Sequence, residues 1–214
     1  MSADTKGYYA TYCILDNTSG DSGVTVDGNM AAIGGELDWT PQLHVTLKGK
    51  EVPRVVLSRG KNALGFIPQD VFKQVRKCLD EGWTCRAFTS LSIFNKLEDR
   101  YLIEVAIICY APEHARELGK FTDLIAARIA RGDHPGVSLS EKELAHVLEA
   151  GGAWADTKPA KLPTLQKGSA LYKTRQTVTE RLANAAAGGN KGCYVAVVAV
   201  VVVIIAVVWL LFFR

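Results

Sequence analysis

The order of apolar and polar residues divides the chain into a strand-rich first half, a helical middle and a long apolar end. Short runs rich in β-branched and aromatic residues predict strands at 8–15, 42–47, 52–57, 63–67, 84–91 and 101–110. The last run is almost entirely apolar, so we expect it at the centre of a sheet. Clusters of Gly, Asn, Asp and Ser between the runs predict turns.

Three helices are predicted where apolar residues recur at helical spacing. The first, at 68–82, is embedded among the strands and carries Phe72 and Val75 on its apolar face. The second covers 112–131, and the third, at 140–151, begins with a Ser-x-x-Glu capping box. Strands and helices that follow one another in this way predict an α+β domain.

The end of the chain, residues 193–213, contains no charged residue. At about 1.5 Å per residue, this segment as a helix would span roughly 31 Å, close to the bilayer's hydrocarbon core of about 30 Å. Tyr194 and Trp209 lie near its two ends, and Lys191 and Arg214 flank it, as residues at a membrane interface do. We therefore expect a single C-terminal transmembrane helix.

Charge around this span predicts its orientation. The basic residues on its N-terminal side are Lys158, Lys161, Lys167, Lys173, Arg175, Arg181 and Lys191. Only Arg214 follows the span, so the positive-inside rule places the N-terminal domain in the cytoplasm. The pattern is that of a tail-anchored, single-pass membrane protein. Its partners would be the lipid bilayer and, through the basic linker, anionic lipid headgroups.

The composition shifts divide the chain into five parts. They are a loose N-terminus at 1–7, a β-rich cytoplasmic domain at 8–111, a helical extension at 112–151, a basic linker at 152–192 and the transmembrane helix at 193–213. The start of the chain has no apolar stretch of the kind found in a secretory signal peptide. The protein is therefore expected to reach its membrane without a cleaved leader.

The cysteines Cys13, Cys78, Cys85, Cys109 and Cys193 form no C-x-x-C pair, and no histidine cluster accompanies them. An odd number of cysteines without a secretory start indicates a reducing compartment. We interpret the cysteines as buried thiols and predict no metal site and no cofactor.

Catalytic motifs are missing from the sequence: it has no P-loop, nucleophile elbow, H-E-x-x-H or G-x-G-x-x-G. The histidines His44, His114, His134 and His146 are scattered, and His134 is interpreted as part of a helix stop. Glu104 lies within an apolar strand, where alternation favours a position facing solvent over a buried acid with a raised pKa. We therefore predict no catalytic residue and a protein that is not an enzyme.

Basic residues gather around the predicted hairpin. Together with one aromatic residue, they are the candidate binding residues Lys48, Lys50, Arg54, Arg59, Lys61 and Phe66. Basic side chains near aromatic ones, here Phe66 with Tyr8, Tyr9 and Tyr12, are typical of surfaces that bind single-stranded nucleic acid. The alternative, which we favour, is a solvated sheet edge whose charges prevent aggregation.

The segment "PRVVLSRGKNALGFIPQDVFKQVRKCLDEGWTCRAFTSL", followed by "YLIEVAIICYAP", resembles the second half of a HIRAN domain over about residues 52–112. The matching features are the strand at 55–57, the G-F-I-P-like strand end at 63–68, the helix that ends at 80–82 and the strands at 84–91 and 101–110. The resemblance implies a small OB-like, partly open β-barrel. It also implies a relation to members that hold the 3′ end of single-stranded DNA.

One segment departs from that family's pattern. Where the family has a stretch like N-x-x-D-x-x-A before the strand at Val55, this chain has "KGKEVPR" at 48–54, without the Asn or the Asp. The resemblance therefore bears on the fold more than on DNA binding, and we transfer no DNA-contacting residue from the family.

Taken with the anchor, these patterns predict a tail-anchored membrane protein that presents a cytoplasmic, non-enzymatic binding or adaptor module. The protein partner is not indicated by the sequence. Two alternatives remain open: a membrane-tethered module that binds single-stranded DNA, and an enzyme without a recognised motif.

Overall fold

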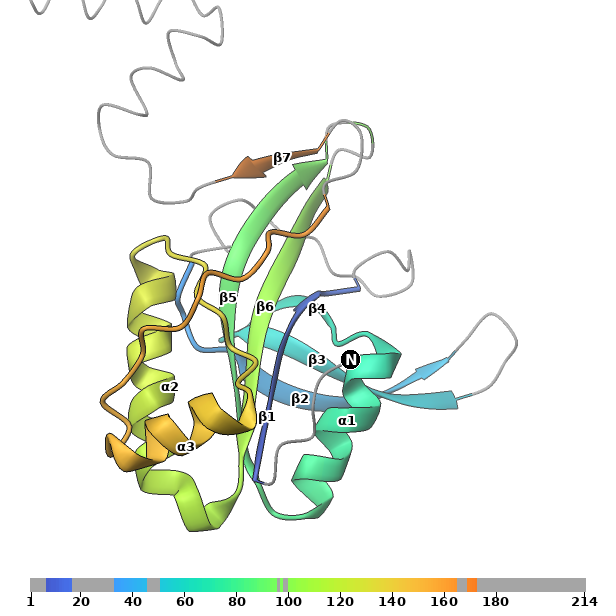
Figure 1. The fold of residues 1–214 in the computed structure, drawn as a ribbon. Helices are drawn as coiled ribbons and strands as arrows, with labels where there is room; N and C mark the ends of the chain where they lie inside the picture. Colours follow the sequence, from blue (N-terminus) through green and yellow to red (C-terminus); the bar gives the residue numbers. More distant parts are fainter. Residues whose placement is uncertain are drawn as a thin grey trace, which may run out of the picture. The chain divides into compact units, whose positions relative to one another are not determined.

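Two antiparallel sheets and three α-helices form an α+β domain in a computed structural model that describes residues 7–16, 33–45, 51–95, 97, 100–164 and 169–172 (Figure 1). Within these residues no helix is long and apolar enough to cross a membrane. The predicted span at 193–213, with Lys191, Tyr194, Trp209 and Arg214, lies outside them.

The first sheet has the strand order β1-β6-β5-β7. Its strands are β1 (Tyr8–Ile14), β6 (Arg100–Tyr110), β5 (Thr84–Asn95) and β7 (Ser169–Tyr172). As predicted, the most apolar strand, β6, is central, between β1 and β5. Both faces of β6 are buried, because Val105 and Ile107 point to one layer and Ala106 and Ile108 to the other.

The second sheet has the order β2-β3-β4. Its strands are β2 (Asp38–Val45), β3 (Glu51–Arg59) and β4 (Asn62–Phe66). β2 begins four residues before the predicted strand and includes Pro41, which lies opposite Val55 of β3. A proline is tolerated here because, among the described residues, β3 is the strand partner of β2 and the other edge of β2 needs no backbone donor.

Two short seams join the sheets through the backbone. Asp16, just after β1, exchanges hydrogen bonds of 2.8 and 2.9 Å with Phe66 of β4. Glu36, just before β2, pairs with Phe88 of β5. Gly65 allows the first seam to close, since its φ is +151° and an added Cβ would lie 2.8 Å from the Cβ of Leu15. Backbone pairing therefore runs from β1 through β6, β5, β2, β3 and β4 back to β1.

The interior between the two sheets is apolar, and α1 (Gln69–Asp80) packs against it. As the sequence predicts, Phe72 and Val75 of this helix are buried. Pro68 is the N-cap, and Gly82, with a φ of +76°, lets the chain turn away just after the helix.

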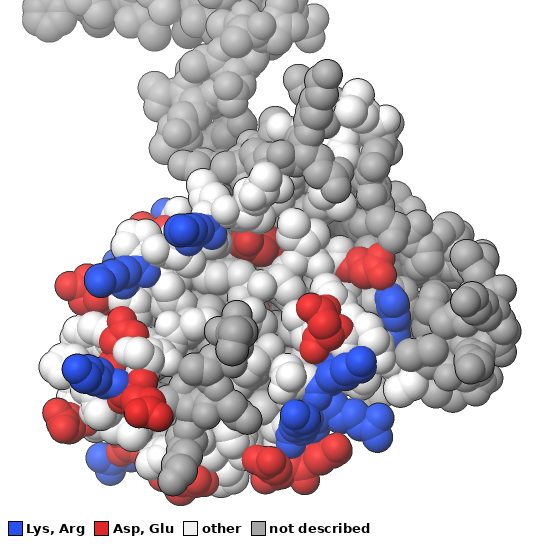
Figure 2. Space-filling view, turned by 45° about the vertical axis from the view of Figure 1, so that its right-hand side comes forward, with Lys and Arg blue, Asp and Glu red and all other residues white. Residues whose placement is uncertain are grey.

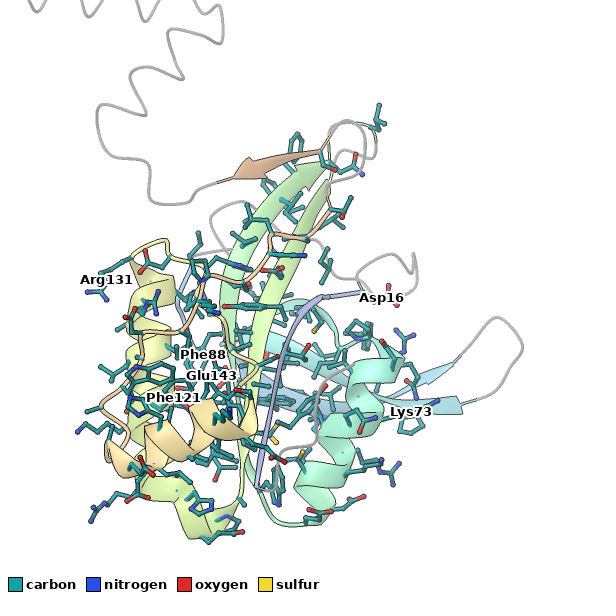
Figure 3. The ribbon with its side chains drawn as sticks, viewed as in Figure 1. Asp16, Lys73, Phe88, Phe121, Arg131 and Glu143 are labelled. Carbon is teal, nitrogen blue, oxygen red and sulfur yellow. The ribbon has the colours of Figure 1, made fainter. Side chains whose placement is uncertain are left out.

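The outer face of the β1–β6–β5 sheet is covered by the remaining helices, η1 (Pro112–His114), α2 (Ala115–Ala130) and α3 (Glu141–Glu149). Phe121 of α2 lies beside Phe88 of β5 and belongs to the same buried cluster (Figure 3). The predicted helical extension is thus part of the domain core, because this face of the sheet is apolar and must be covered. The capping box of Ser140 and Glu143 is confirmed.

The first part of the predicted linker also packs on the domain. We call residues 153–164 the strap. Its backbone binds residues that follow α2, with the Gly136 amide donating to the Lys158 carbonyl at 2.7 Å and the Ala160 amide donating to the His134 carbonyl at 2.9 Å. β7 then pairs with the end of β5. Residues 165–168 and 173–192 of the predicted linker lie outside the described part of the chain.

A candidate binding groove between α1 and the β2–β3 hairpin

An open groove of about 350 Å³ lies between α1 and the β2–β3 hairpin. Its walls are mostly apolar and come from Pro41, Pro53, Val55, Phe72 and Leu79. Ligand-binding pockets commonly measure about 300–1,000 Å³ and are lined by apolar residues with a few polar ones. The groove therefore has the size and lining to receive one bulky apolar side chain.

Helical spacing explains how α1 contributes to this groove. Phe72, Arg76 and Leu79 follow one another at intervals of four and three residues, so they lie on one stripe of the helix facing the hairpin. Phe72 is buried at the base, whereas Leu79 is 45% exposed. An apolar side chain that stays half in solvent at the rim of a groove is available to a partner.

The charges at the groove are paired and balanced. The guanidinium of Arg54 lies 2.9 Å from the carboxylate of Asp16 and 5.5 Å from the centre of the Phe66 ring. Arg76 and Asp80 on α1 approach to 3.7 Å, and both side chains are largely exposed. Figure 2 shows basic and acidic side chains mixed on its left side, and a group of basic side chains at the lower right with acidic ones above and below it. The described charges at the groove, Arg54, Arg76, Asp16 and Asp80, therefore give no strong field of either sign.

Of the predicted basic cluster, the structure describes Arg54, Arg59 and Lys61, and it does not bring Arg54 and Arg59 together. Arg54 borders the groove, but Arg59 is half-buried and donates to the Thr89 hydroxyl at 3.2 Å, and burial lowers its pKa. Their positions on β3 are roughly 16 Å apart along the strand. Lys61 is exposed in the turn between β3 and β4. Lys48 and Lys50 lie outside the described residues.

The aromatic residues expected to stack on bases are mostly core residues. Tyr8, Tyr9 and Phe66 are buried, with between 1% and 7% of their surface exposed. The ring of Tyr12 is already stacked on His134, with the ring centres 4.2 Å apart. The four rings therefore do not form an open stacking surface, because the sheet that carries three of them is covered on both faces, and this counts against the nucleic-acid alternative.

Glu104 is another correction. It is 3% exposed, and its Oε2 accepts hydrogen bonds from the Ser90 hydroxyl at 2.6 Å and from Nε2 of His134 at 2.8 Å. Alternation along β6 places Glu104 on the outer face, as expected, but the segment after α2 covers that face. The sequence did contain a signal for this burial. The outer face of the sheet is apolar and must be covered, and the helices that follow β6 in the sequence cover it.

The cysteines of the domain are thiols in or beside the inner core. Hydrogen bonds with Cys78 and Cys85, and then burial, raise the pKa of the Cys109 thiol far above its usual range. Burial, followed by the charges of Glu104 and Asp70, raises the pKa of Cys13 to about 12. Within the described residues, no group of three or more His, Cys, Asp or Glu side chains is arranged to hold a metal ion.

The groove offers apolar contact area, balanced charges and a rim residue, Leu79, that is half-exposed. This arrangement suits recognition of an uncharged, apolar side chain more than recognition of a phosphate backbone, which requires an excess of positive charge. No protein-family model, curated protein or solved structure matches the chain.

Proposed function

We propose that this protein is a tail-anchored, single-pass membrane protein whose cytoplasmic N-terminal domain is a non-enzymatic adaptor that binds a protein partner. The contact would be the groove between α1 and the β2–β3 hairpin. The observation that carries the proposal is the apolar lining of the groove, with Leu79 45% exposed at its rim. The anchor would hold the adaptor at the membrane surface and raise its local concentration there.

A protein segment suits this groove better than a nucleic acid does. In the described part of the chain, Arg54 and Arg76 are the basic residues that line the groove, and each lies beside a carboxylate. A phosphate backbone would therefore compete with existing ion pairs. Pro41 places the edge strand β2 beside the same groove. A partner segment that runs along this edge would place a bulky apolar side chain in the groove.

For the fold we propose an OB-like, partly open β-barrel, similar to that of the HIRAN family. The circular order of backbone pairing and the position of α1 against the interior support this proposal. The proposal extends to the fold alone. For the groove residues we draw no role from the family.

The groove is tested by peptide selection with the full chain in lipid nanodiscs, using a phage-displayed library of random peptides. Peptides that carry a bulky apolar residue should be enriched. Leu79→Asp should weaken the selected peptides at least tenfold. Leu162→Asp is the matched control, because Leu162 is exposed to a similar degree, 53%, and does not line the groove. Selected peptides that bind Leu79→Asp as well as the wild type would contradict the proposal.

The anchor needs a separate test. Full-length protein expressed in cells should stay with the membrane fraction during alkaline carbonate extraction. Introducing Val202→Asp and Ile204→Lys, which place two charges near the middle of the predicted span, should release it. Protease added to sealed vesicles should digest the N-terminal domain if that domain faces the cytoplasm. Extraction of the wild-type protein, or protection of its N-terminal domain, would contradict the location but not the groove.

A further inference from the structure

A buried polar cluster joins the outer face of the sheet to the segment after α2. The carboxylate of Glu104 on β6 binds Nε2 of His134 at 2.8 Å, and these side chains are 4% and 9% exposed. Ser90, at a register shift in β5, donates its hydroxyl to the same carboxylate at 2.6 Å. On the other side of the ring, Nδ1 lies 3.3 Å from the carbonyl oxygen of Ala160.

This geometry favours a doubly protonated histidine beside the carboxylate. Both ring nitrogens of His134 face oxygen acceptors, and a neutral imidazole can donate from only one nitrogen. The doubly protonated ring satisfies both acceptors and neutralises the Glu104 carboxylate. Removal of one charge from a buried pair leaves the other uncompensated, which is strongly destabilising.

The pair lies where the strap attaches to the domain. The strap binds the backbone at residues 134–136, through the Ala160 and Gly136 amides and a bridge between Pro135 and Pro159. Residues 135–138 are in turn held by β1. The hydroxyls of Tyr12 and Tyr8 donate to the carbonyls of residues 135 and 137 at 2.6 and 2.7 Å. The His134 side chain adds an ionic link from this layer to β6.

We propose that the Glu104–His134 pair is a pH-sensitive latch that keeps the strap on the domain at neutral and lower pH and releases it as the pH rises. The strap leads through β7 towards the basic linker. Given the membrane anchor of the proposed function, release of the strap together with β7, which pairs with β5, would lengthen the tether between the domain and the bilayer. The latch itself does not depend on what the groove binds.

The direction of the pH effect follows from the state of His134. Burial lowers its pKa, but the hydrogen bond and charge of Glu104, together with the hydrogen bond to the Ala160 carbonyl, outweigh burial and raise the pKa above its ordinary value. A group with a raised pKa stabilises the closed form below its ordinary pKa, near 6.5, and this stabilisation is lost as the pH rises through the raised pKa.

Other titratable groups around the pair do not change this direction. Burial raises the pKa of the Tyr12 hydroxyl, so the ring stacked on His134 stays neutral. Arg128 of α2 and Asp133 bind each other at 3.5 Å, and Arg128 also donates to the carbonyl of Ala155. Cys13 lies on the inner face, and the charge of Glu104 contributes to raising its pKa. The thiol stays protonated because this pKa is about 12.

The test is hydrogen–deuterium exchange of the full chain in detergent micelles, followed by mass spectrometry from about pH 6 to 9 and corrected for the intrinsic exchange rate. Protection of peptides that cover 134–138 and 156–162 should fall by up to about tenfold per pH unit above the ordinary histidine pKa, and then level off. Peptides from β6 should keep their protection and report that the domain remains folded.

Two variants and a control complete the test. Glu104→Gln and His134→Gln should each give a strap with low protection that no longer depends on pH. His114→Gln, at the histidine that ends η1, should keep the wild-type profile. A flat wild-type profile, the same pH dependence in Glu104→Gln, or equal loss of protection in β6 would overturn the proposal. The wild-type series is decisive even if a variant fails to fold.

Discussion

Both faces of the β1–β6–β5 sheet are covered by buried apolar side chains, but the outer face adds a buried ion pair and hydroxyl hydrogen bonds. The inner face meets α1 and the second sheet, and its cluster consists of apolar side chains and thiols. The outer face meets α2, α3 and residues 131–164, where buried hydroxyls and an ion pair bind backbone carbonyls and each other. Apolar burial does not titrate, whereas the polar contacts are directional and one depends on charge. We therefore expect the outer layer to open locally, and with pH, while the inner layer stays closed.

The largest losses of stability should come from substitutions at two neighbouring residues of β6 whose side chains point to opposite faces of the sheet. Ile107→Ala on the inner side and Ile108→Ala on the outer side should each lower the free energy of unfolding by about 2–5 kcal/mol, since both side chains are fully buried. Urea denaturation followed by circular dichroism measures both. A cost below about 1 kcal/mol for either residue would mean that its face is not packed as described.

Closure of the strands depends on Gly65. Gly65→Ala should lower stability by about 1–3 kcal/mol, because the positive φ is unfavourable for alanine and the new Cβ would approach Leu15 at the seam. The matched control is Gly60→Ala, which also has a positive φ but no atom within 4 Å of the added Cβ. Equal losses for the two variants in the same denaturation assay would show that the seam does not require a glycine.

The hydroxyls that hold the outer layer should matter less for global stability. Tyr8→Phe removes one buried donor to the carbonyl of Val137 and should cost about 1 kcal/mol. Hydrogen exchange at residues 135–138 should become faster, with no change in β3 or β4 of the other sheet. A uniform increase in exchange over the whole domain would contradict the independence of the two layers.

The smallest expected effect is on the chemical reactivity of the thiols in the inner layer. At about pH 8, Cys13 and Cys109 should resist iodoacetamide in the native full-length chain and become labelled in urea, because only thiolates react and both pKa values are raised. Peptide mass spectrometry locates the label. Rapid native labelling of Cys109 would show that the inner layer opens as readily as the outer one.

Sequence analysis correctly placed the helices and strands whose apolar residues form a strong local pattern. β6 and α1 could be placed because an apolar run and a helical repeat are local signals. β7 and the strap could not, since their backbone contacts with β5 and residues 134–136 involve no periodic apolar pattern. The burial of Glu104 was missed because it depends on a segment about 30 residues further along the chain.

The groove was only partly foreseen. Arg54 was identified from the density of basic residues around the hairpin, and it does border the groove. The apolar wall was missed because it combines Pro41 with Leu79, residues far apart in the sequence that meet only after α1 packs against the second sheet. Local composition thus indicated the charges but not the surface they surround.

The most direct test of the proposed adaptor function is fluorescence anisotropy of a labelled single-stranded oligonucleotide with the full chain in nanodiscs. The measurement is made in a salt series from about 50 to 200 mM. A charge-balanced groove that recognises protein predicts no sub-micromolar binding, even at the lowest salt. Sub-micromolar binding that weakens by several orders of magnitude over this range and requires a free 3′ end would contradict the account and favour a nucleic-acid-binding module.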